Sequence, residues 1–250
     1  MTQTAVITGA TSGIGAEFAR QLAERGYNLV LTGRNTGRLE STAEELARDY
    51  SVKTEWIAAD LATPEGVAAV ADRVRKPDVG LLVNNAGYGL KNDFARNELQ
   101  DEVDHLNVLV GAPLQLSHAA LNAMSSRGGG RIVNVASVAG FIPRGTYSAA
   151  KAWVINFSRW ANLYYRDRGI TVTAVCPGFV HTDFHARMEM DKTIYPKWMW
   201  LNADRVVREA LADAFAGKGI SIPSKRYRVL ATVGNRAPQA LVAKLAGRGR

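Results

Sequence analysis

Two side chains with complementary proton chemistry stand four residues apart in the segment Tyr147-Ser148-Ala149-Ala150-Lys151. On a helix this spacing places the Tyr147 phenol and the Lys151 ammonium one turn apart on one face. A neighbouring cation favours the phenolate and lowers the tyrosine pKa towards the working pH, as a general acid or base requires. The pair predicts a proton-transfer site, and the alternative for Lys151 is a surface cation.

Two other segments follow apolar runs that we predict to be strands. Ser137 comes after the run 131–135, and Pro177-Gly178 closes the run 170–176. Open α/β sheets bind their ligands outside the carboxyl ends of the strands. We therefore expect both segments at the edge that carries the proton-transfer pair, with a strand-end cap as the alternative for Ser137.

A glycine cluster, Thr8-Gly9-Ala10-Thr11-Ser12-Gly13-Ile14-Gly15, joins a predicted first strand to a predicted first helix. Glycines there permit a tight turn and let backbone N–H groups approach a pyrophosphate at the helix N-terminus. The spacing is Gly-x3-Gly-x-Gly, which differs from the Gly-x-Gly-x-x-Gly of the general dinucleotide fingerprint. An ordinary turn is the alternative, but the position between first strand and first helix favours a dinucleotide.

The second predicted strand ends in Leu31-Thr32-Gly33-Arg34 and supplies no acid for a ribose 2′-hydroxyl. Arg34 is able to pair with a 2′-phosphate instead, with Arg38 in support. The sequence thus favours NADP over NAD, and a solvated loop cation is the alternative for Arg34.

The elements that position these residues are short β-branched runs alternating with segments of helical spacing. The predicted strands are 4–8, 28–32, 53–57, 80–84, 131–135, 170–176 and an edge strand at 219–222, and the predicted helices are 14–25, 36–49, 64–75, 97–126, 146–168 and 203–217. Nearly all-apolar strands separated by helical crossovers predict a parallel sheet covered on both faces, a doubly wound α/β fold. We expect one Rossmann-type domain over 1–222, with strand order 3-2-1-4-5-6-7, and a basic C-terminal extension over 223–250.

Together, in this order, these segments resemble the classical short-chain dehydrogenase/reductase family over residues 4–222. The segments that carry the resemblance are Thr8-Gly9 to Gly15, Asn84-Asn85-Ala86-Gly87, Asn107, Ser137, Tyr147-x3-Lys151 and Pro177-Gly178. The resemblance implies that Tyr147 donates the proton to a substrate carbonyl and that Ser137 hydrogen-bonds the same oxygen. It also implies that Lys151 lowers the tyrosine pKa and holds the nicotinamide ribose, and that Asn107 fixes a water that relays protons to Lys151.

The resemblance implies a set of residues for an NADP(H) cofactor as well. They are Gly9, Thr11, Ser12, Gly13, Ile14 and Gly15 in the glycine cluster, Arg34, Asp60 and Leu61 towards the adenosine, Asn84, Ala86 and Gly87 along the sheet edge, and Tyr147, Lys151, Pro177, Gly178, Val180 and Thr182 at the nicotinamide end. Two features depart from the family pattern. Only nine residues separate Ser137 from Tyr147, which shortens the substrate loop, and Ser12 stands where some NADP-preferring members have a cation.

Composition bounds the remaining possibilities. The 250 residues are 47% hydrophobic and 22% charged, which suits a globular domain and disfavours disorder. The lone Cys176 excludes an intrachain disulfide and a cysteine-based zinc site and fits a cytoplasmic location, and the N-terminus shows no secretory signal. His181 and His185 stand four apart without a convincing third ligand, so we expect no metal.

The net charge of +8 resides in the C-terminal segment, because no acid follows Asp213. Eight cations do follow it: Lys218, Lys225, Arg226, Arg228, Arg236, Lys244, Arg248 and Arg250. This localisation argues against nucleic-acid binding by the body of the protein. The alternatives for the segment are a solvated end, weak contact with an anionic membrane surface, or binding of an acyl-carrier or coenzyme A-linked substrate.

Aromatic residues recur along the predicted helix 146–168, at Trp153, Phe157, Trp160 and Tyr164, and align on one face. That face belongs either to the core or to a homodimer or homotetramer interface with helix 97–126. Met188, Met190, Trp198, Met199 and Trp200 suggest either an apolar substrate cover or a small satellite core.

The function expected is NADP(H)-dependent, reversible reduction of a hydrophobic ketone or aldehyde. A non-turnover NADP-binding sensor or scaffold is the alternative.

Overall fold

The computed structural model describes residues 3–182 and 196–236, with side chains described as far as residue 232. Its centre is a seven-stranded parallel sheet of order β3-β2-β1-β4-β5-β6-β7, which confirms the expected topology. The strands are β1 (Thr4–Thr8), β2 (Asn28–Gly33), β3 (Thr54–Ala58), β4 (Val79–Asn84), β5 (Gly130–Val135), β6 (Ile170–Val175) and β7 (Ile220–Ser221).

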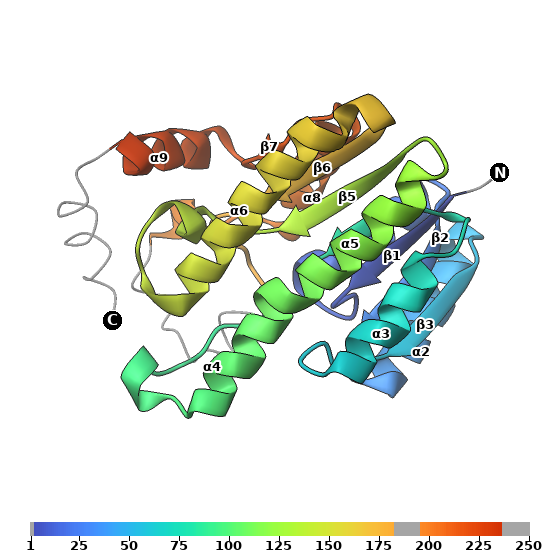
Figure 1. Cartoon of the computed structure of the whole chain (residues 1–250), viewed down its shortest axis with the longest axis horizontal. Helices are drawn as coiled ribbons and strands as arrows, with labels where there is room; N and C mark the ends of the chain where they lie inside the picture. Colours follow the sequence, from blue (N-terminus) through green and yellow to red (C-terminus); the bar gives the residue numbers. More distant parts are fainter. Residues whose placement is uncertain (1–2, 183–195, 237–250) are drawn as a thin grey trace.

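Helices cover both faces of the sheet (Figure 1). They are α1 (Gly13–Glu24), α2 (Thr36–Tyr50), α3 (Pro64–Val74), α4 (Leu99–Leu106), α5 (Ala112–Ser125), α6 (Gly145–Tyr165), α8 (Ala203–Phe215) and α9 (Lys225–Arg236). Side chains of α1, α2 and α8 form one apolar layer with the sheet, and those of α3 and α5 form the other, which α6 extends. Because both faces are covered, the central strands are buried along nearly their whole length instead of alternating between buried and exposed residues.

The predicted helix 97–126 is interrupted. It consists of α4, a π-helical turn over Asn107–Gly111, and α5. Pro113 has no N–H to donate back into the preceding turn, and the Ala112 N–H bonds the Asn107 carbonyl five residues earlier. The wide turn lies at a residue that the sequence assigned to the site.

The segment after residue 222 includes a helix that the sequence pattern did not indicate. In α9 the Tyr227 side chain is only 4% exposed and packs with Val180, Leu201 and Val206 in a small apolar cluster beside the main core. At least this part of the basic segment is therefore integrated into the fold. Within the described ranges, no helix is long and apolar enough to cross a membrane.

Candidate active site

The loops that follow β1, β4, β5 and β6 meet at one edge of the sheet, because the strands are parallel and adjacent. Many of the predicted site residues lie in these loops or at the start of α1. Others come from the end of β4, the π-helical turn and α6, and Arg34, Asp60 and Leu61 follow β2 and β3. The topology thus gathers residues that are far apart in the chain, such as Gly9 and Pro177, which are 168 positions apart, as the sequence pattern predicted.

In the loop after β1, the glycines serve conformation and close approach. Gly9 and Gly13 have φ values of 65° and 58°, in the left-handed region that disfavours side chains. A Cβ on Gly13 would lie 3.1 Å from the Thr182 side chain, so this loop and the loop after β6 face each other closely. The amino end of α1 opens into the same space, where its N–H groups favour an anion.

Asn85 is a site residue that the sequence reasoning did not single out. Its Nδ2 donates to the carbonyl oxygens of Thr8 (2.9 Å) and Gly9 (3.1 Å), while the Thr8 hydroxyl accepts from the backbone N–H groups of Asn85 and Ala86. These bonds tie the glycine loop to the end of β4. The signal in the sequence that could have pointed to Asn85 is its place as the second Asn of the Asn-Asn-Ala-Gly segment.

Asn84, by contrast, points into the protein. The side chain is 5% exposed, and its Nδ2 donates to Asn134 Oδ1 at 2.8 Å and to Ser117 Oγ at 3.2 Å. Asn134 Nδ2 in turn donates to Ser158 Oγ at 2.9 Å. This series of hydrogen bonds joins β4 and β5 to α5 and α6, so Asn84 stabilises the sheet edge from inside the protein.

Ser137, Tyr147 and Lys151 come together as the sequence predicted. The Ser137 and Tyr147 side chains are hydrogen-bonded, and Ser137 Oγ also accepts from the Ala139 N–H at 3.1 Å. Lys151 is 5% exposed, and its Nζ lies 5.7 Å from the centre of the Tyr147 ring and donates to the Val135 carbonyl at 2.7 Å. The hydroxyl groups of Ser137 and Tyr147 are thus adjacent, and the buried Lys151 ammonium lies near the Tyr147 ring.

The pKa of Tyr147 moves in the direction opposite to the sequence expectation. Burial raises it to about 12, and the hydrogen bond with Ser137 opposes this shift only in part. Burial also lowers the pKa of Lys151 to about 8. Desolvation penalises the charged form of both groups and outweighs the attraction that the spacing argument considered alone. The phenol is therefore protonated at neutral pH.

Asn107 opens the π-helical turn, and its Nδ2 lies 3.4 Å from the Ala62 carbonyl oxygen. In the loop after β3, the exposed Asp60 accepts a hydrogen bond from the Ala62 N–H through its carboxylate. Leu61, between them, is buried. On the other side, a Cβ on Gly87 would lie 3.9 Å from Lys151 Nζ. Asn107 thus connects the π-helical turn to the loop after β3, and Gly87 lies beside Lys151.

His105 is a buried residue that packs against Tyr147. It is 1% exposed, its ring stacks on the Tyr147 ring with centres 6.2 Å apart, and its Nε2 lies 3.1 Å from the Tyr88 carbonyl oxygen. Burial lowers the pKa of His105, which keeps the imidazole neutral. Its place two residues before Asn107 was the only sequence signal.

At the far end of the site, Pro177 and Val180 are buried and Thr182 is partly buried. The Pro177 carbonyl accepts from the Val138 N–H at 3.0 Å, which joins this loop to that of Ser137. Arg34 is exposed just after β2, and Arg38 is exposed near the start of α2. The structure does not describe His185, Met188, Met190 or residues 237–250. Among the residues that it does describe, no group of three His, Cys, Asp or Glu side chains could hold a metal ion.

These residues fit a dinucleotide that carries a 2′-phosphate. The amino end of α1 suits the pyrophosphate, and Gly13 leaves the approach open where a Cβ would meet Thr182. Arg34 is exposed just after β2, and the last residues of that strand, Leu31 to Gly33, include no acid.

Comparison with known proteins agrees with the geometry. Residues 3–193 match the family model described as short chain dehydrogenase. The chain belongs to this family. A short-chain dehydrogenase from Sphingobium yanoikuyae, solved in complex with NADPH, is 34% identical, with a TM-score of 0.86 over 96% of this chain and 95% of that one. The bulky-bulky ketone specific alcohol dehydrogenase from Comamonas testosteroni is 31% identical, with a TM-score of 0.81 over 95% and 96%.

Among curated relatives of this short-chain dehydrogenase family member, the human inactive hydroxysteroid dehydrogenase-like protein 1 is 34% identical over 188 residues. That match covers 73% of this chain and 57% of the relative. The chain spans little more than half the length of the first curated relatives that it matches.

Proposed function

We propose that the protein is an NADP(H)-dependent oxidoreductase that reversibly reduces the carbonyl of an apolar ketone or aldehyde to an alcohol. The observation that carries this proposal is the hydrogen-bonded pair of Ser137 and Tyr147 hydroxyls above the buried Lys151. Two adjacent hydroxyls are what a carbonyl oxygen needs: one to donate a proton and one to hold the oxygen in place.

In the reducing direction, Tyr147 gives its proton to the substrate oxygen. Its pKa of about 12 keeps the phenol protonated and ready to donate. Ser137 holds the same oxygen by a hydrogen bond, and Lys151 stabilises the phenolate that remains. Asn107 is proposed to support the return of a proton through water. When bound, NADPH supplies the hydride.

The cofactor is proposed to lie along the sheet edge, with its phosphates at the glycine loop and its 2′-phosphate at Arg34. The NADPH complex of the Sphingobium yanoikuyae neighbour supports this placement. The nicotinamide would then face Tyr147 and Lys151 from the side of Pro177, Gly178, Val180 and Thr182.

An apolar substrate is supported by the aromatic surroundings of the loop after β6. The Trp200 ring packs against Phe179 (centres 5.3 Å apart) and stacks on His181 (5.2 Å), and Trp198 is 52% exposed. The name of the Comamonas testosteroni neighbour points to bulky ketones. We therefore propose a bulky carbonyl compound.

The experiment that tests the proposal is NADPH oxidation over a panel of bulky ketones and aldehydes, with wild type beside Tyr147→Phe. NADPH binding is followed by fluorescence in parallel. Wild type is expected to turn over at least one carbonyl, and Tyr147→Phe to lose roughly 10²–10⁴-fold in rate while still binding NADPH. If both proteins bind NADPH and neither turns over, the sensor function gains; the inactive human relative makes this second candidate worth the control.

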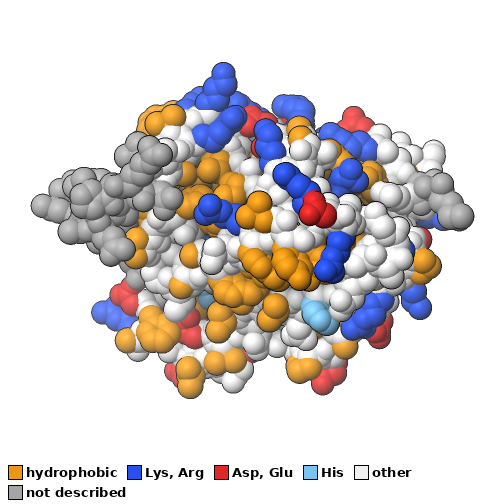
Figure 2. All heavy atoms as spheres, turned by 45° about the horizontal axis from the view of Figure 1, so that its top comes forward, with side chains coloured by type: hydrophobic (Ala, Val, Ile, Leu, Met, Phe, Trp, Pro, Cys, Tyr) orange, Lys and Arg blue, Asp and Glu red, His pale blue; other side chains and the backbone are white. Residues whose placement is uncertain are grey.

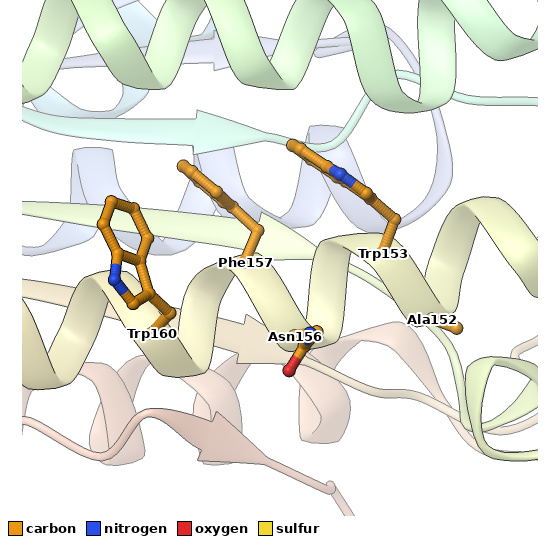
Figure 3. A pocket seen from close by; sticks show the side chains of 5 residues that line it. All are labelled: Ala152, Trp153, Asn156, Phe157 and Trp160. Carbon is orange, nitrogen blue, oxygen red and sulfur yellow. The ribbon is translucent and has the colours of Figure 1, made fainter.

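A homodimer or homotetramer through α4, α5 and α6 is also proposed. Trp153, Phe157 and Trp160 leave the same side of α6 (Figure 3) and line a hollow of about 550 Å³ with Ala152 and Asn156. Apolar side chains gather on this face of the molecule (Figure 2), and Trp160 and Leu163 are 51% and 75% exposed. Trp160→Glu is expected to lower the mass measured by light scattering; a monomeric wild type would contradict the assembly.

Weak contact between the C-terminal segment and an anionic membrane surface is proposed for a cytoplasmic protein. The support is that exposed cations and apolar side chains occur together on α9, as at Arg228 and Val229, and that four further cations stand in residues 236–250. Co-sedimentation with phosphatidylserine vesicles is expected to fall when residues 236–250 are deleted, and unchanged co-sedimentation would count against the contact.

A further inference from the structure

Tyr227 lies on α9, outside every segment that carries the family pattern, yet it reaches the edge of the site. Its side chain is 4% exposed. Its hydroxyl accepts from the Phe179 N–H at 3.1 Å and donates to the Met199 carbonyl at 2.7 Å. One buried hydroxyl therefore joins two backbone segments that are twenty residues apart.

Those two segments are paired with each other. Val180 and Leu201 form a parallel bridge, the Leu201 N–H donates to the Phe179 carbonyl at 2.9 Å, and the His181 N–H donates to the Leu201 carbonyl at 2.9 Å. The Phe179 N–H and the Met199 carbonyl are not used in this pairing. Tyr227 satisfies both and so holds the pair from one end.

The Tyr227 ring also occupies the space beside Gly178. A Cβ on Gly178 would overlap the ring, although the backbone of Gly178 is not in the left-handed region. The ring, rather than the backbone conformation, is therefore what requires glycine at this position. Gly178 in turn belongs to the Pro-Gly turn at the proposed nicotinamide end.

Three loops of the site rest on the same small cluster. Ile14 from the glycine loop and Val138 from the Ser137 loop pack on the cluster that contains Val180 and Tyr227. The Val138 N–H donates to the Pro177 carbonyl at 3.0 Å. A shift of Tyr227 would therefore be passed to the turn at Gly178 and to the loop that carries Ser137.

We infer that Tyr227 is a positioning residue for the reaction proposed above. The inference rests on that proposed function. Tyr227 acts through the Phe179 N–H and through the space beside Gly178. It sets the placement of the Gly178–Val180 turn, and through Val138 and Pro177 the placement of the Ser137 hydroxyl. The C-terminal helix thereby contributes to catalysis by fixing where the nicotinamide end and the carbonyl oxygen are held.

The test is Tyr227→Phe, which keeps the ring and removes both hydrogen bonds. With rates normalised to NADPH-binding sites, kcat is expected to fall about tenfold. The Kd for NADPH should change less than about threefold, because phosphate contacts dominate its binding. The isotope effect on kcat with 4-deuterated NADPH should rise, since misplacement slows hydride transfer itself. A purely structural role would lower the number of binding sites and leave the isotope effect unchanged.

The matched control is Tyr50→Phe. Tyr50 ends α2 at the opposite edge of the sheet and hydrogen-bonds Arg20, so the control also removes a tyrosine hydroxyl bond. It should keep kcat and the isotope effect of wild type. If Tyr227→Phe is not recovered folded, Gly178→Ala, which pushes a methyl group against the same ring, is measured in the same way. It should show the same fall in kcat and rise in isotope effect, with little change in the Kd for NADPH.

Wild-type values of kcat and isotope effect in folded Tyr227→Phe, or in Gly178→Ala when it replaces that variant, would overturn the inference and leave the proposed function intact. A wild-type protein that binds NADPH and turns over no carbonyl would overturn the proposed function, and this inference with it.

Discussion

The ring of Tyr227 fills the space that a side chain on Gly178 would need. The two residues are 49 positions apart and belong to different elements, the turn after β6 and α9. Their contact makes the identity of each depend on the other. It also brings the last described helix within reach of the site.

Gly178→Ala is expected to destabilise the protein by about 1–3 kcal/mol, because an added methyl group forces a packed ring to move. Urea unfolding measures the change. Gly37→Ala is the control, since a Cβ at Gly37 in α2 meets only Asn35 Oδ1, at 3.8 Å. An alanine at residue 178 that is tolerated as well as one at residue 37 would show that the ring moves freely.

The pair Gly178→Ala and Tyr227→Leu should be coupled. Leucine ends before the outer atoms of the phenol ring, so it vacates the space that the new methyl group enters. We expect the double variant to be more stable than the sum of the two single effects implies, by about 0.5–3 kcal/mol, as found for residues in contact. Strict additivity in urea unfolding would argue against the contact.

Arg34→Ala should raise KM for NADPH roughly 10–100-fold and change KM for NADH little. The reason is that a charge-assisted hydrogen bond to the 2′-phosphate contributes about 1.5–3 kcal/mol. Steady-state kinetics with both cofactors gives the ratio. Arg48→Ala, an exposed cation near the other end of α2, should leave both KM values unchanged. An equal effect on both cofactors would place Arg34 away from the phosphate.

The pH dependence of reduction should be governed by Lys151 on the alkaline side. Its lowered pKa of about 8 means that the ammonium loses its proton, and its charge, as the pH rises through that value. Tyr147 stays protonated up to about pH 12 and therefore remains able to donate. We expect kcat/KM for NADPH, at saturating carbonyl, to fall above about pH 8. A profile that stays flat to about pH 10 would contradict the assignment.

His105 should make stability fall in mild acid. Burial lowers its pKa in the folded protein, so as the pH falls through the ordinary histidine range near 6.5 the unfolded chain takes up a proton more readily than the folded one. The free energy of unfolding should therefore fall as the pH drops through this range. His105→Phe, which keeps a stacked ring, should flatten the dependence, whereas His118→Gln on the exposed surface of α5 should not. Equal slopes in all three proteins would refute the role.

The sequence predicted the sheet order and the place of the site because both depend on local signals. Apolar runs, glycine spacing and the Tyr-x3-Lys segment each act over a few residues, and parallel topology then brings them to one edge. The direction of the Tyr147 pKa was not predictable in this way. It is decided by how much protein surrounds the hydroxyl, which residue spacing does not contain.

The contributions of Asn85, His105 and Tyr227 were missed for a related reason. Each acts through a partner far along the chain: Thr8 for Asn85, Tyr147 for His105 and Phe179 for Tyr227. A tyrosine in a basic stretch has no periodicity that distinguishes an anchor from a solvated side chain. Tertiary packing supplied what the pattern lacked.

The π-helical turn at Asn107–Gly111 has a rotational consequence. Each residue of an α-helix turns the chain by about 100°, so a wider turn changes the angular phase between the helices on either side. The side of α4 that carries His105 towards Tyr147 therefore does not have to line up with the side of α5 that packs on the sheet. Removing one residue from this turn would restore a continuous α-helix and turn His105 away from the phenol.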